Sequence, residues 1–128
     1  MLTELQPLLW PLGRLLLGSL FVIAGIRHFF ILDALVPKVA SRGVPAPKFT
    51  VMAASVFQAL AGVALAAGWQ TVWAGTGLIV FTLVVSVMLV NFWDMKGAER
   101  GKAFNTFFSN VSIIGGLLVA IAHATPAG

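Results

Sequence analysis

Residues 72–93, VWAGTGLIVFTLVVSVMLVNFW, form an apolar stretch without a single charged side chain. An α-helix rises about 1.5 Å per residue, so about 20 apolar residues cross the roughly 30 Å hydrocarbon core of a bilayer. This stretch is therefore long enough to cross a membrane as one helix. Three further stretches of the same character are residues 12–32, 49–68 and 107–124.

The composition of the whole chain agrees with a membrane protein. It is 59% hydrophobic and 9% charged, with a mean hydropathy of +1.00, whereas soluble domains are about 25% charged. A chain of 128 residues has room for one domain. We therefore expect a single all-α domain over residues 1–128, with four transmembrane helices in an antiparallel bundle.

The connections between the four stretches differ in length. Residues 33–48 contain three prolines, which favour an irregular or re-entrant loop with a short interfacial helix near residues 35–41. Residues 69–71 predict a tight turn, and residues 94–104 predict a polar loop. The N-terminal stretch lacks a basic region and a cleavage site, so we expect the first helix to be retained.

Basic residues predict the orientation, because Lys and Arg concentrate in cytoplasmic loops. The first and third connections contain Lys38, Arg42, Lys48, Lys96, Arg100 and Lys102, whereas the other side has only Arg14, just inside the first stretch. We therefore expect a multi-pass protein of the bacterial inner membrane with both termini outside the cytoplasm. Nucleic-acid binding is not expected, since that requires basic residues clustered on one face.

Small residues recur at helical spacing within the spans. The stripes are Ser112, Gly116, Ala120 and Ala124 in the fourth stretch, Ala54, Gln58, Gly62 and Ala66 in the second, and Gly18 and Gly25 in the first. Such stripes predict close helix packing in a membrane. Spacing leaves open whether the partner helices belong to the same chain, to a second copy or to other membrane subunits.

Cysteine is absent, which excludes disulfides, Fe–S clusters and thiolate metal sites within this chain. Two His residues are a small supply for a metal centre, and the expected topology places them near opposite faces of the membrane, so a shared haem is not expected. Phosphate-loop, zinc-protease and dinucleotide-binding motifs are also missing. The sequence therefore assigns no catalytic residue and no metal ligand.

Polar groups at membrane depth are candidates for a binding site. The expected topology brings five of them to the cytoplasmic ends of three helices, with Gln58 deeper in the membrane. The candidate cofactor-binding residues are Arg27, His28, Gln58, Asn91, Asp94 and Asn110. Two interpretations remain open. In the first, these residues are structural and bind lipid headgroups or neighbouring helices. In the second, they line a pocket in which His28, with Asp94 as its partner, donates a hydrogen bond to a quinone carbonyl or exchanges a proton.

Five short motifs resemble the DoxX family in order along nearly the whole chain. They are residues 14–29 (RLLLGSLFVIAGIRHF), 43–47 (GVPAP), 58–62 (QALAG), 91–94 (NFWD) and 107–118 (FFSNVSIIGGLL). The resemblance implies a four-helix membrane protein. Some DoxX-like proteins are subunits of thiosulfate:quinone oxidoreductase, and others are linked to membrane-associated oxidoreductase complexes.

The chain departs from the family pattern at three titratable positions. Gln58 stands where the family often has Glu, Asn91 where it often has His, and Ser109 where Lys is common. These departures favour a docking role over proton-coupled catalysis.

Two functional hypotheses follow. The first is an accessory subunit of a membrane redox complex that holds a quinone or lipid headgroup; the second is a structural subunit that packs against helices of a larger complex. Membrane lipids are expected to contact the chain in both. Transport is disfavoured, since the sequence has neither an internal repeat nor a span broken by Pro.

Overall fold

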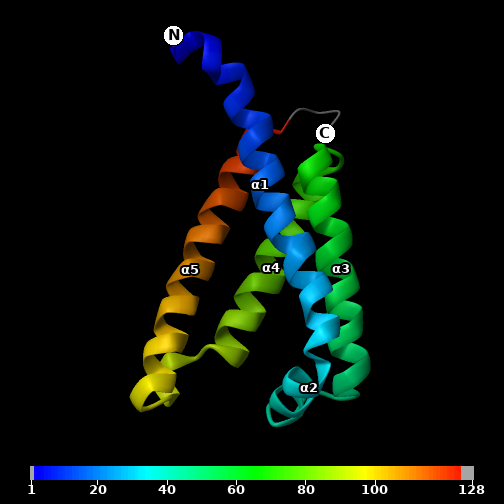
Figure 1. The fold of residues 1–128 in the computed structure, drawn as a ribbon, viewed down its shortest axis with the longest axis vertical. Helices are drawn as coiled ribbons and strands as arrows, with labels where there is room; N and C mark the ends of the chain where they lie inside the picture. The colour runs from blue at the N-terminus through cyan, green and yellow to red at the C-terminus, as the bar shows by residue number, and fades with distance from the viewer. Residues whose placement is uncertain (1, 125–128) are drawn as a thin grey trace.

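The chain forms four long helices and one short helix that pack as an antiparallel bundle, in a computed structural model that describes residues 2–124 (Figure 1). The elements are α1 (Leu2–Phe30), α2 (Leu32–Ala40), α3 (Pro47–Ala67), α4 (Thr71–Leu89), the 3-10 turn η1 (Phe92–Asp94) and α5 (Gly97–Ala122). Four of these helices are long and apolar enough to cross a membrane. The prediction of an all-α membrane protein with four spans is confirmed.

Two helix starts differ from the prediction. Helix α1 begins at Leu2 instead of residue 12, and α5 begins at Gly97 instead of residue 107. Hydropathy marks the part of a helix that matches hydrocarbon, whereas a helix can continue into the aqueous interface as long as its backbone hydrogen bonds form. Most of the predicted polar loop therefore forms the first turns of α5, which is 26 residues long.

The connections position the short elements at one end of the bundle. A short helix in the first connection is confirmed as α2, which begins at Leu32 instead of residue 35. The turn after α3 is closed by Gly68 in a left-handed conformation, with φ +75°. The sequence predicts Asn91 and Asp94 at the cytoplasmic end of the third helix. Helix α4 ends at Leu89, so both residues instead lie beyond it, with Asp94 in η1. The end of the bundle that contains α2 is called the α2 end. The opposite end, where α1 begins and α5 ends, is called the terminal end (Figure 1).

Helices α1 and α3 pack backbone against backbone through glycine. A Cβ atom at Gly18 would lie 2.5 Å from the carbonyl oxygen of Gly62, and one at Gly25 would lie 2.7 Å from that of Ser55. Only a hydrogen fits at these positions, so Gly18 packs against Gly62 and Ala66 within one chain. The other two members of the predicted stripe in the second span, Ala54 and Gln58, line a cavity.

Helix α5 contacts α1 only near the terminal end. There Ala120 is buried, and a Cβ atom at Gly116 would lie 3.7 Å from Leu17. Ser112, one turn closer to the α2 end, is exposed, since the two helices diverge (Figure 1). The buried core lies toward the terminal end and consists of Phe21, Ala61, Leu65, Ala74, Leu78, Leu117 and Ala120.

Replacing Gly18 with Leu should destabilise the bundle, because the new side chain overlaps the backbone of α3. Overpacking of this kind costs about 1–3 kcal/mol or more. The midpoint of thermal unfolding in mild detergent should therefore fall.

The matched control is Gly115→Leu, on α5, where a Cβ atom would meet nothing within 4 Å. This variant should unfold near the wild-type midpoint. Equal midpoints for Gly18→Leu and Gly115→Leu would show that α1 and α3 do not pack through Gly18.

Candidate functional site

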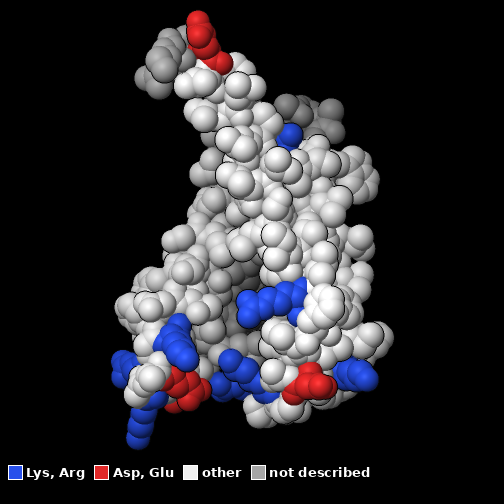
Figure 2. All heavy atoms as spheres, in the orientation of Figure 1, with Lys and Arg blue, Asp and Glu red and all other residues white. Residues whose placement is uncertain are grey.

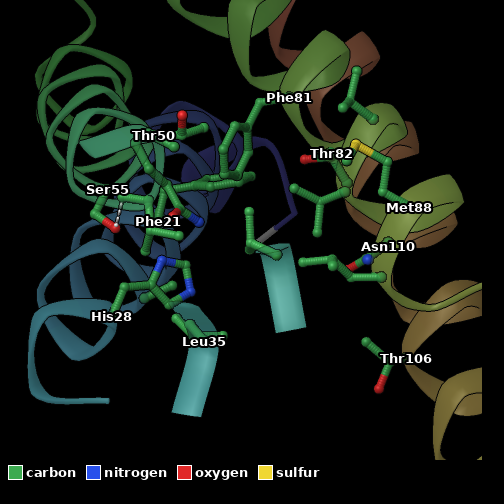
Figure 3. Close-up of a pocket in the computed structure, with 18 of the residues that line it drawn as sticks. Phe21, His28, Leu35, Thr50, Ser55, Phe81, Thr82, Met88, Thr106 and Asn110 are labelled. Atoms are coloured by element: carbon green, nitrogen blue, oxygen red, sulfur yellow. Dashed lines mark hydrogen bonds between the residues drawn. The ribbon is translucent and has the colours of Figure 1, made fainter. Parts of the chain in front are cut away.

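A cavity of about 550 Å³ lies inside the α2 half of the bundle, and all five α-helices contribute to its wall (Figure 3). Figure 3 shows Phe21, Ser55 and His28 on one side and Thr82, Met88 and Asn110 on the other. The cavity exists because α5 diverges from α1, while the glycine contacts hold α3 against α1. Its volume lies in the range of small-molecule sites, about 300–1,000 Å³.

Helix α2 closes this cavity at the α2 end. Leu35 and Val39 from α2 and Val44 from the following loop line the wall there, and Val39 is buried. After α2, Gly43 and Ala46 take left-handed conformations, with φ +78° and +45°, and turn the chain into α3, which begins at Pro47. The proline-rich connection therefore forms part of the cavity wall.

Gln58 is a buried polar residue in a largely apolar wall. Its side chain is 6% exposed, and its Oε1 atom has no hydrogen-bond partner among the described residues. A buried carbonyl oxygen without a partner costs about 1–3 kcal/mol. An unpartnered buried oxygen calls for a physical explanation, and a bound ligand or an ordered water would each provide one.

His28 and Asn110 bring two further polar side chains to the same cavity from α1 and α5. Asn110 Nδ2 donates a 3.0 Å hydrogen bond to Ser86 Oγ, which in turn donates to the carbonyl oxygen of Thr82 at 2.7 Å. This chain fixes the amide of Asn110 on the wall. In residues 2–124, the structure shows no hydrogen bond to the imidazole of His28, so both ring nitrogens remain available.

Asn91 and Asp94 belong to a separate network at the α2 end. Arg42 Nη2 donates to Asn91 Oδ1 at 3.0 Å, and Asn91 Nδ2 donates to Asp94 Oδ2 at 3.2 Å. Asn91 is 5% exposed, so this network is partly shielded from water. It joins the α2–α3 loop to the α4–α5 connection and does not line the cavity.

The structure thus divides the six predicted residues into three groups. His28, Gln58 and Asn110 line one cavity, Asn91 and Asp94 form the network with Arg42, and Arg27 is exposed on α1. Asn110 lies in the interior of α5, about 20 Å beyond the first residue of that helix at 1.5 Å per residue.

Sequence reasoning missed two contributors to these groups. From the sequence, Arg42 is only a loop charge, and Ser86 is only a small residue in an apolar helix. Nothing in the local sequence predicts either contact, since both join segments far apart in the chain. Among the described residues, no group of three His, Asp or Glu side chains is placed to bind a metal ion.

Comparison with known proteins is consistent with this architecture. The family model of DoxX matches residues 9–91. The inner membrane protein YphA of Escherichia coli (strain K12) is 30% identical over 114 residues, which cover 89% of this chain and 81% of that protein. No solved structure matches the chain.

The family match begins in α1 and ends at Asn91, so it includes His28, Gln58 and the proline-rich connection that lines the cavity. The match to YphA extends over most of both chains, and the four apolar helices are those of a membrane protein. The chain therefore belongs to the DoxX family of membrane proteins.

Proposed function

We propose that this chain is an accessory subunit of a quinone-linked redox assembly in the bacterial inner membrane and that its cavity holds a quinone ring. The observation that supports this most directly is that Gln58, whose buried Oε1 has no partner among the described residues, lines an apolar cavity of about 550 Å³. A ligand for this site needs an apolar body and a few polar atoms, since the wall offers many apolar contacts and few hydrogen bonds.

The polar groups of the cavity suit both redox states of a quinone. The Gln58 carboxamide has an acceptor oxygen for a quinol hydroxyl and a nitrogen that donates to a quinone carbonyl. His28 also lines the cavity and offers one donor and one acceptor in its neutral form. The two residues therefore bind either state without changing their own charge.

Entry from the membrane is consistent with the shape of the molecule. Figure 2 shows a hollow on the face between the diverging helices, with uncharged atoms above it and a Lys or Arg side chain along its lower edge. In a bilayer this face meets lipid tails, so a lipid-soluble molecule can reach the cavity without crossing water. A quinone with an isoprenoid tail has this solubility.

The chain is better suited to holding such a molecule than to reacting with it. Gln58 cannot exchange a proton at physiological pH, and the network of Asp94 lies outside the cavity wall. Electrons would therefore come from a redox centre in another subunit. Our proposal for the partners is one or more membrane subunits of the same assembly.

A purely structural role is the second candidate, and the outer face of α5 favours it. Ser112 is exposed, and a Cβ atom at Gly115 would meet nothing within 4 Å. Small residues left uncovered on a span allow another helix to approach closely. The two candidates differ in whether the cavity must be occupied.

Replacing Gln58 or His28 with Leu should release a bound quinone, because each change removes hydrogen bonds from the cavity wall. A loss of about 1–1.5 kcal/mol per substitution corresponds to a fall of roughly fivefold to tenfold in retained quinone. Quinone would be measured by solvent extraction of the protein purified in mild detergent.

Matched controls are Gln6→Leu and His123→Leu, which change exposed residues of the same types outside the cavity. Both should retain quinone at the wild-type level. Wild-type protein without quinone, or cavity variants that retain as much as the controls, would support the structural role instead.

We also propose that both termini face away from the cytoplasm. Most of the Lys and Arg residues gather at the α2 end (Figure 2), and the side of a membrane protein richer in these residues normally faces the cytoplasm. This orientation places the opening of the cavity nearer the cytoplasmic leaflet.

Because the chain has no Cys, single introduced cysteines can report the orientation. In cells with a permeabilised outer membrane, an impermeant maleimide should label Gln70→Cys, in the α3–α4 turn, and not Ser41→Cys, after α2. Both positions are exposed. Labelling of Ser41→Cys and not of Gln70→Cys would show that the termini face the cytoplasm and would contradict the proposal.

A further inference from the structure

A second hollow of about 570 Å³ lies at the terminal end, between α1 and α5. Leu16, Leu17 and Leu20 of α1 line it on one side, and Gly116 and Val119 of α5 line it on the other. Arg14 and Trp10 also contribute to its wall. We call it the terminal groove. It is separate from the quinone cavity described above, although Leu20 contributes to both.

Arg14 is a partly buried cation without a carboxylate close to it in the described part of the chain. Its Nε donates a long 3.5 Å hydrogen bond to the carbonyl oxygen of Ala66, and its guanidinium lies 5.8 Å from the ring centre of Trp10. The four acidic residues of the chain are Glu4, Asp33, Asp94 and Glu99. Three of them lie at the α2 end, and Glu4 precedes Arg14 by about 15 Å of helix.

The contacts of Arg14 hold its guanidinium in place and leave donors free. A Cβ atom at Gly68 would lie 2.7 Å from Arg14 Cζ, so the absence of a side chain there makes room for the guanidinium. Ala66 belongs to the last turn of α3, where carbonyl oxygens attract a cation. The bond to Ala66 uses one of the five N–H groups of Arg14, and the other four can bind an anion.

We infer that the terminal groove binds one anionic glycerophospholipid, with its phosphate on Arg14 and an acyl chain between α1 and α5. Charge complementarity supports this occupant, since an arginine can bind a phosphate through two parallel hydrogen bonds. The leucines of α1 and the bare surface of Gly116 match an acyl chain. A lipid with a choline headgroup fits less well, because it brings a second cation close to Arg14.

The bound lipid would also fill a gap in the bundle. Helix α5 contacts α1 weakly, and Gly13 of α1 is exposed, at a position where a Cβ atom would meet nothing within 4 Å. An acyl chain in the groove adds apolar contact to both helices. Because this inference rests on Arg14 and not on Gln58, it is independent of the proposed quinone function.

Native mass spectrometry in detergent, with phosphatidylglycerol and phosphatidylcholine of identical chains, tests this inference. Wild-type protein should retain about tenfold more phosphatidylglycerol, as expected for a charge-assisted contact. Arg14→Gln keeps a donor for Ala66 and removes the charge, so it should lower phosphatidylglycerol binding to the phosphatidylcholine level. Gly13→Phe, which fills the groove, should lower the binding of both lipids.

The controls are Arg100→Gln and Gly115→Phe, at exposed positions of α5 outside both hollows. They should bind both lipids as the wild type does. The inference is overturned if wild-type protein retains the two lipids equally, or if Arg14→Gln binds phosphatidylglycerol no less than Arg100→Gln.

Discussion

The close contact of α1 with α3 determines the arrangement of the other helices. Two helices in a membrane gain nothing from hiding apolar side chains from water, so they associate where their backbones can approach. Gly18, Gly25 and Gly62 permit that approach along much of α1. Helices α4 and α5 then pack beside this pair, and α5 meets α1 only near the terminal end (Figure 1). Their divergence toward the α2 end leaves the cavity that Gln58 lines.

Physical reasoning from sequence recovers the spans because each one must match the thickness of hydrocarbon. It also recovers the packing role of Gly18 and Gly62, since small residues at helical spacing have few other uses within a span. It fails at the start of α5, where polar residues such as Glu99 and Lys102 continue the helix beyond the hydrocarbon. Helix propensity is not lost at the membrane surface, so hydropathy alone cannot locate that boundary.

The candidate site was only partly predictable for a related reason. The sequence places His28, Gln58 and Asn110 on three spans, and the rise per residue gives their depth. The sequence does not determine which sides of these helices face one another. Asn91 and Asp94 depend on the end of α4 and on Arg42 from a distant loop. No local pattern encodes such a contact. The missing partner of Gln58 Oε1 is likewise visible only once the surrounding helices are in place.

The two hollows differ in the polar groups that they offer, a neutral amide and imidazole in one and a guanidinium in the other. The proposed quinone site depends most on Gln58 serving a ligand and not the fold. The most direct test is the unfolding free energy of ligand-free Gln58→Met, a change that preserves shape and removes the unpartnered carbonyl. We predict a stability equal to or higher than that of the wild type, since an unsatisfied buried polar group is lost. A decrease of about 1–3 kcal/mol would contradict the account, because it would show that the Gln58 amide already stabilises the bundle through hydrogen bonds of its own.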